Sequence, residues 1–87
     1  MVKVFIPSLL REATGGLDQV EIVAATIRQV VTSLEARFPG IRERLCAGDG
    51  LRPGLAVAVN GTISSMGLLQ KVADGSEVHF LPAIGGG

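Results

Sequence analysis

Length, composition and charge exclude several classes of protein. The 87 residues suffice for one small domain with a single core, and a hydrophobic content of 47% is too high for a disordered chain. Eight basic residues balance eight acidic ones, so the charge indicates neither a nucleic acid nor an anionic membrane surface as a partner.

The first part of the chain predicts two strands. Residues 2–6 are β-branched and aromatic and end at Pro7, which is typical of a strand. Residues 17–23, in which apolar and polar residues alternate, predict a second strand after a glycine turn at 15–16. We expect the two strands to form a hairpin, whereas residues 9–14 between them indicate neither a helix nor a strand.

Residues 27–38 predict the main helix. Their apolar residues recur at spacings of three and four and so share one helical face. These residues are Ile27, Val30, Val31, Leu34 and Phe38. Thr26 is expected to cap the N-terminus, with Gln29 completing a capping box. The Pro39-Gly40 dipeptide ends the helix.

The second half predicts short elements separated by turns. A further turn of helix is expected over 41–45, followed by a loop over 47–54. The expected strands are residues 55–59, residues 62–63 and residues 77–81, the last of them ended by Pro82. Asn60-Gly61 is the dipeptide preferred in two-residue hairpin turns. Leu68 and Val72 indicate a short turn packed under the sheet before a second turn at Asp74-Gly75.

These elements predict an α+β domain, in which one main helix packs on one face of a mixed sheet of four to five strands. The first and last strands are expected to be parallel neighbours at the centre, and the second sheet face stays open. Strand alternation predicts the residues of this open face. They are Lys3, Phe5, Ala56, Ala58, His79 and Leu81. Their apolar members favour a docking surface, and the alternative is that scattered exposed apolar residues have no function.

The sequence ends in three glycines, Gly85, Gly86 and Gly87, soon after the last predicted strand. We expect a single domain over residues 1–81 and a flexible tail over residues 82–87, because a run of glycine forms a thin, mobile strip. One interpretation of this tail is a frayed terminus. The other is that the α-carboxylate of Gly87 is a reactive group, presented on a tail narrow enough to enter another enzyme's active site.

Five segments together carry a family resemblance. They are VKVF at 2–5, LEARFPG at 34–40, VNG at 59–61, DGSEV at 74–78 and LPAIGGG at 81–87. On these motifs the chain resembles the ubiquitin-like sulfur carrier family, which includes the small subunit of molybdopterin synthase and the thiamin-pathway carrier. The LLR segment at 9–11, the TGG segment at 14–16 and the ending look most like the branch that supplies sulfur for cysteine synthesis. Two residues depart from the family pattern. The family often has aspartate where Ser76 stands, and usually has a residue other than glycine at the position of Gly85.

The resemblance implies a β-grasp fold and a mechanism. An ATP-dependent enzyme of the ubiquitin-activating type adenylates the Gly87 carboxylate, and sulfur then displaces AMP to give a thiocarboxylate. Gly85 and Gly86 thread into the partner. The docking surface is expected to comprise Phe5, Ala58, His79, Leu81 and Ile84. The protein is then a carrier and not an enzyme, binds no cofactor and leaves ATP to its partner. Its partners are the activating enzyme and a sulfur-accepting synthase or large subunit.

His79 and Cys46 have simpler interpretations. His79 is the only histidine and has no second ligand at a suitable spacing, so we predict no metal site. Cys46 is the only cysteine, which excludes an internal disulfide and suits a reducing cytosol. The sequence contains no apolar run of about 18 residues and no basic-then-apolar leader, so we expect a cytoplasmic protein.

Two alternative functions remain open. The first is a protein modifier, in which activated Gly87 forms an isopeptide bond with lysines of other proteins. The second is a plain interaction domain whose glycine tail is incidental.

Overall fold

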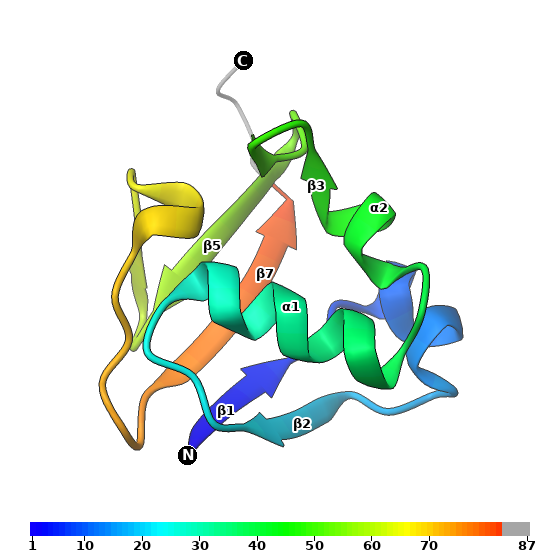
Figure 1. Cartoon of the computed structure of the whole chain (residues 1–87), viewed down its shortest axis with the longest axis horizontal. Coiled ribbons are helices and arrows are strands. Elements are labelled where there is room, and N and C mark those ends of the chain that lie inside the picture. The colour runs from blue at the N-terminus through cyan, green and yellow to red at the C-terminus, as the bar shows by residue number, and fades with distance from the viewer. Residues whose placement is uncertain (83–87) are drawn as a thin grey trace.

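The computed structural model describes residues 1–82, and its centre is a five-stranded mixed sheet (Figure 1). The strand order is β2-β1-β7-β5-β6, with β1 and β7 parallel and the other neighbours antiparallel. The strands are β1 (Val2–Phe5), β2 (Gln19–Ile22), β5 (Leu55–Val59), β6 (Thr62–Ile63) and β7 (Glu77–Pro82). The parallel pairing of the first and last strands inside the sheet confirms the prediction.

The helix α1 (Ile27–Arg37) crosses one face of this sheet (Figure 1). The remaining elements are the 3-10 helices η1 (Ser8–Thr14) and η2 (Gly67–Leu69), the helix α2 (Ile41–Leu45), and a hairpin of β3 (Cys46–Ala47) and β4 (Gly50–Leu51). This is the predicted α+β arrangement of the β-grasp type. Within residues 1–82, no helix has the length and apolar character needed to span a membrane.

The N-terminus of α1 is held by the predicted cap. The Thr26 Oγ1 accepts a hydrogen bond of 3.2 Å from the Gln29 N–H, and the Gln29 Oε1 accepts one of 2.7 Å from the Ala25 N–H. The Gln29 side chain therefore accepts its bond from Ala25, the residue before the cap, and not from the N–H of Thr26 as in a standard capping box. At the other end, the N–H of Phe38 donates to the Leu34 carbonyl, and the helix ends one residue earlier than predicted.

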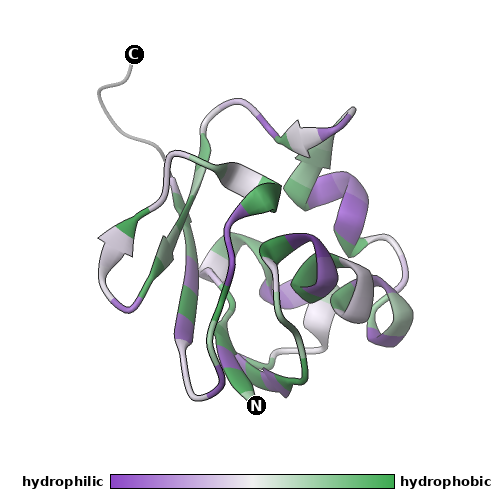
Figure 2. Cartoon of the chain, turned by 60° about the vertical axis from the view of Figure 1, so that its left-hand side comes forward, coloured by the Kyte–Doolittle hydropathy of each residue, from purple (hydrophilic) through white to green (hydrophobic). Residues whose placement is uncertain are grey.

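The core lies between α1 and the inner face of the sheet. Alternate strand residues point into it, and Figure 2 shows hydrophilic and hydrophobic residues alternating along the strands. The buried residues of the helix and the central strands are Ile27, Val30, Val31, Leu34, Val2, Val4, Val57, Val78 and Phe80. Leu68 and Val72, predicted to pack under the sheet, are buried as well.

Three segments differ from the prediction. Residues 9–14, which indicated neither a helix nor a strand, form η1 together with Ser8, and Leu10 and Thr14 are buried. The loop predicted over 47–54 contains most of the β3–β4 hairpin. The last strand includes Pro82, which is the Cα partner of Leu55, instead of ending before it. Pro82 is tolerated because β1 pairs with β7 only as far as His79, so this end of β7 has one free edge.

Candidate functional site

The face of the sheet away from α1 carries a continuous row of side chains. Residues that are Cα partners in neighbouring strands project from the same face. The row crosses all five strands through Gln19, Phe5, His79, Ala58 and Ile63. Leu81 and Ala56 form a second, shorter row next to it, on the side toward the end of β7. We call the surface of Phe5, His79, Ile63 and Leu81 the outer face.

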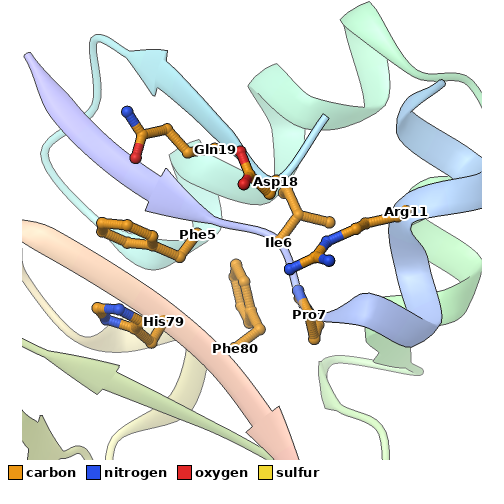
Figure 3. A pocket seen from close by; sticks show the side chains of 8 residues that line it. All are labelled: Phe5, Ile6, Pro7, Arg11, Asp18, Gln19, His79 and Phe80. Carbon is orange, nitrogen blue, oxygen red and sulfur yellow. The ribbon is translucent and has the colours of Figure 1, made fainter. Parts of the chain in front are cut away.

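Phe5 and His79 are stacked on each other at the centre of this row. Their ring centroids are 4.1 Å apart and the rings are nearly parallel, with an interplanar angle of 3° (Figure 3). Aromatic pairs contribute about 0.5–1.5 kcal/mol beyond the area that they bury. Both residues were predicted for the docking surface. The structure brings them together as one half-buried aromatic unit on the parallel strands β1 and β7.

Ala58 corrects the predicted docking surface. It points to the outer face as expected, but only 7% of its surface is exposed. Its Cα partners are His79 on one side and Ile63 on the other, and both carry larger side chains that cover the single methyl group. Ala58 is therefore too buried, between its larger neighbours, to contact a partner protein.

Ile63 was missed by the sequence analysis. It is 62% exposed and lies beside Ala58 on the outer face. The signal was present, because a two-residue turn at Asn60-Gly61 makes Val59 and Thr62 partners and so pairs Ala58 with Ile63. The two turn residues have positive φ values of 51° and 85°, as this class of hairpin turn requires.

Leu81 completes the outer face near the tail. It is half-buried and pairs with Ala56, and Pro82 follows it as the last described residue. The predicted site residues Ile84, Gly85, Gly86 and Gly87 lie outside the described residues. The chain that leads to Gly87 thus begins next to Leu81.

A pocket of about 260 Å³ opens beside the aromatic stack (Figure 3). It is lined by Phe5, Ile6, Pro7, Arg11, Asp18, Gln19, His79 and Phe80. The sequence analysis singled out neither Arg11 nor Asp18 as a site residue. Arg11 lies in residues 9–14, which matched no regular pattern, and Asp18 was assigned to the solvated face of the strand predicted over 17–23.

Within residues 1–82, neither Cys46 nor a cluster of metal-ligating side chains forms a second candidate site. Burial raises the pKa of the Cys46 thiol, which disfavours the thiolate, although Arg42 and Arg28 oppose the effect. Across residues 1–82, no three side chains of His, Cys, Asp or Glu gather as they would around a metal ion.

The family model for the ThiS family matches residues 4–87. The chain belongs to the ThiS family. It is 41% identical, over an alignment of 93 residues, to the sulfur carrier protein CysO of Mycobacterium tuberculosis strain H37Rv. That alignment covers 99% of this chain and 98% of the relative. The predicted family resemblance is thereby confirmed.

Solved structures agree with this ThiS-family assignment. A chain in the crystal structure of the Amycolatopsis orientalis BexX/CysO complex matches with a TM-score of 0.91 and 38% identity, covering 100% of both chains. The solution structure of small archaeal modifier protein 1 from Methanosarcina acetivorans matches with a TM-score of 0.79 and 26% identity, covering 99% of this chain and 95% of that one. The β-grasp fold of this chain is shared with both of these structures.

Proposed function

We propose that this protein is a sulfur carrier, with the carboxylate of Gly87 as the carrying group. The observation that carries the proposal is the similarity to the sulfur carrier protein CysO along 99% of the chain. The terminal pair Gly86-Gly87 supports it, because two residues without side chains can enter a narrow active-site channel.

The chemistry requires activation in another protein. A carboxylate is a poor electrophile because it is anionic and lacks a good leaving group. A carboxylate oxygen of Gly87 attacks the α-phosphorus of ATP, pyrophosphate leaves, and an acyl adenylate forms. A sulfur nucleophile then attacks the carbonyl carbon, AMP leaves, and the tail ends in a thiocarboxylate once the donor has released its sulfur. ATP is a substrate of the partner enzyme. This chain supplies no catalytic group, and its contribution is to place the Gly87 carboxylate at the reaction site.

The outer face is the proposed docking surface for the activating enzyme. It combines the Phe5–His79 stack with the exposed Ile63 and with Leu81, which directly precedes the tail. Exposed apolar groups gathered on one face favour protein binding. The structure of a BexX/CysO complex supports a partner-binding role for proteins of this kind. A sulfur-accepting synthase or large subunit is the second proposed partner.

Cysteine biosynthesis is the proposed destination of the sulfur. The support is the similarity to CysO together with the segments at 9–11 and 14–16 and the ending, which resemble the cysteine-synthesis branch.

An intact-mass measurement tests the proposal. The protein is incubated with ATP, a purified ubiquitin-activating-type enzyme and a sulfur donor. We expect a mass gain equal to the replacement of one oxygen by sulfur. A matched variant that lacks Gly86 and Gly87 is expected to stay unmodified. Unchanged mass with every activating enzyme, together with full cellular function of the shortened variant, contradicts the proposal.

A protein modifier is the second candidate function. The observation that favours it is the structural match to small archaeal modifier protein 1 at 26% identity. This function predicts higher-mass adducts on lysines of other proteins in a cell extract supplied with ATP. The carrier function predicts a thiocarboxylate without such adducts.

A further inference from the structure

The pocket beside the Phe5–His79 stack forms where two neighbouring strands part. β1 ends at Phe5, and the chain turns away at Pro7 into η1, whereas β7 continues to Pro82. The pocket lies at this end of the sheet, which is also the end from which the chain leads to Gly87. Its volume of about 260 Å³ is below the roughly 300–1,000 Å³ of small-molecule sites, which favours an occupant of side-chain size.

Arg11 reaches into this pocket from η1 (Figure 3). The element that carries it is anchored, because the Thr14 hydroxyl donates a hydrogen bond of 3.1 Å to the Arg11 carbonyl. The Gly16 N–H donates a second bond of 2.8 Å to the same carbonyl. Within residues 1–82, the Arg11 guanidinium makes neither a salt bridge nor a hydrogen bond. Its donors are therefore available to an incoming group.

We propose, on the basis of the carrier function proposed above, that this pocket receives an acidic side chain of the activating enzyme. Its carboxylate pairs with the Arg11 guanidinium, and its methylene groups lie against Pro7 and the Phe5 ring. Arginine matches a carboxylate with two parallel hydrogen bonds. The pocket shares Phe5 and His79 with the outer face, so one partner covers both. Arg11 is then a specificity residue that sets the position of the partner.

Asp18 lines the same pocket and sharpens the prediction. No salt bridge joins it to Arg11 within the described chain, and it is exposed. Its negative charge repels a carboxylate and confines it to the Arg11 side of the pocket. Removing the charge of Asp18 must therefore strengthen the proposed contact, whereas removing that of Arg11 must weaken it.

Steady-state loading kinetics test this contact. The KM for the carrier is measured with the purified activating enzyme that forms the thiocarboxylate. We expect Arg11→Gln to raise KM about tenfold with kcat unchanged, since one charge-assisted contact is lost. Asp18→Asn is expected to lower KM, because the charge that repels the incoming carboxylate is removed. Lys71→Gln removes the same charge from an exposed residue outside the pocket and is expected to load like wild type. The Arg11→Gln effect shrinks at high salt.

The outcomes separate this proposal from the carrier function. If wild type loads and Arg11→Gln has the KM of Lys71→Gln, the pocket proposal is overturned and the carrier function stands. If Asp18→Asn raises KM as strongly as Arg11→Gln, the occupant bridges both charges and is not a carboxylate. If wild type acquires no thiocarboxylate, both proposals fall. Unchanged melting temperatures of the exposed-site variants exclude unfolding as the cause of a raised KM.

Discussion

At the scale of single residues, the outer face depends on which side chains remain exposed beside their larger or smaller neighbours. Phe5 and His79 are half-buried by each other, and Ala58 is covered by His79 and Ile63. Ile63 lies beyond Ala58 on β6, and Leu81 lies two residues further along β7 than His79; both are apolar groups without a covering helix. A partner that binds here meets one aromatic unit flanked by aliphatic side chains, a composition enriched at interface centres.

Leu81→Asp tests the outer face at its end nearest the tail. We expect the KM for loading to rise about tenfold, equivalent to about 1.4 kcal/mol, because a charge would be buried in an apolar contact. The melting temperature is expected to change little, since Leu81 points away from the core. Val23→Asp places the same charge on a residue that is 77% exposed just after β2 and serves as the matched control. Equal kinetics of the two variants would place docking elsewhere.

At the scale of elements, α1 and α2 are joined by a carboxylate that caps the second helix. Glu35 accepts hydrogen bonds from the Gly40 N–H at 3.0 Å through Oε2 and from the Arg42 N–H at 2.9 Å through Oε1. These two backbone bonds lower the pKa of Glu35 below its ordinary value of 4.5. The first turn of α2 thus receives partners for donors that its short helix cannot satisfy.

Glu35→Gln is expected to lower the free energy of unfolding at neutral pH. Because the folded pKa is depressed, the stabilisation is fully present above the unfolded value of 4.5 and is lost as pH falls through the folded pKa. Wild type and variant are therefore expected to converge in acid. Urea unfolding at neutral pH and in acid measures the difference at each. A gap between the two proteins that is the same at both pH values would argue against this role of the carboxylate.

At the scale of the whole molecule, one core holds both the helix layer and the sheet in place. Leu34 of α1 is 0% exposed, and the strands of the sheet contribute Val4, Val57 and Val78 to the same core. A domain this small has a total stability of about 5–15 kcal/mol. A single truncation in the core thus removes a large share of it.

Leu34→Ala is expected to cost about 2–5 kcal/mol, through lost burial and the cavity left behind. Chemical denaturation followed by circular dichroism measures the loss. Arg28→Ala, on the exposed side of the same helix, is expected to stay within about 0.5 kcal/mol of wild type. A small effect of Leu34→Ala would mean that the core adapts around α1.

The sequence by itself determined the main local elements, and the role proposed for Gly87 rests on the ending of the sequence alone. The spacing of apolar residues in α1, the Thr26 cap and the Asn60-Gly61 turn depend on residues close in the chain, so their patterns can be read directly. The first and last strands were also placed correctly as parallel neighbours.

Only the tertiary structure decided which side chains meet. The stacking of Phe5 on His79, the covering of Ala58 and the pocket that Arg11 enters all depend on the register between strands far apart in sequence. Alternation assigns each residue to a face of the sheet. It does not predict which residues of other strands lie beside it or how much of its side chain they leave exposed. It also does not say where β1 leaves β7, and that separation creates the pocket.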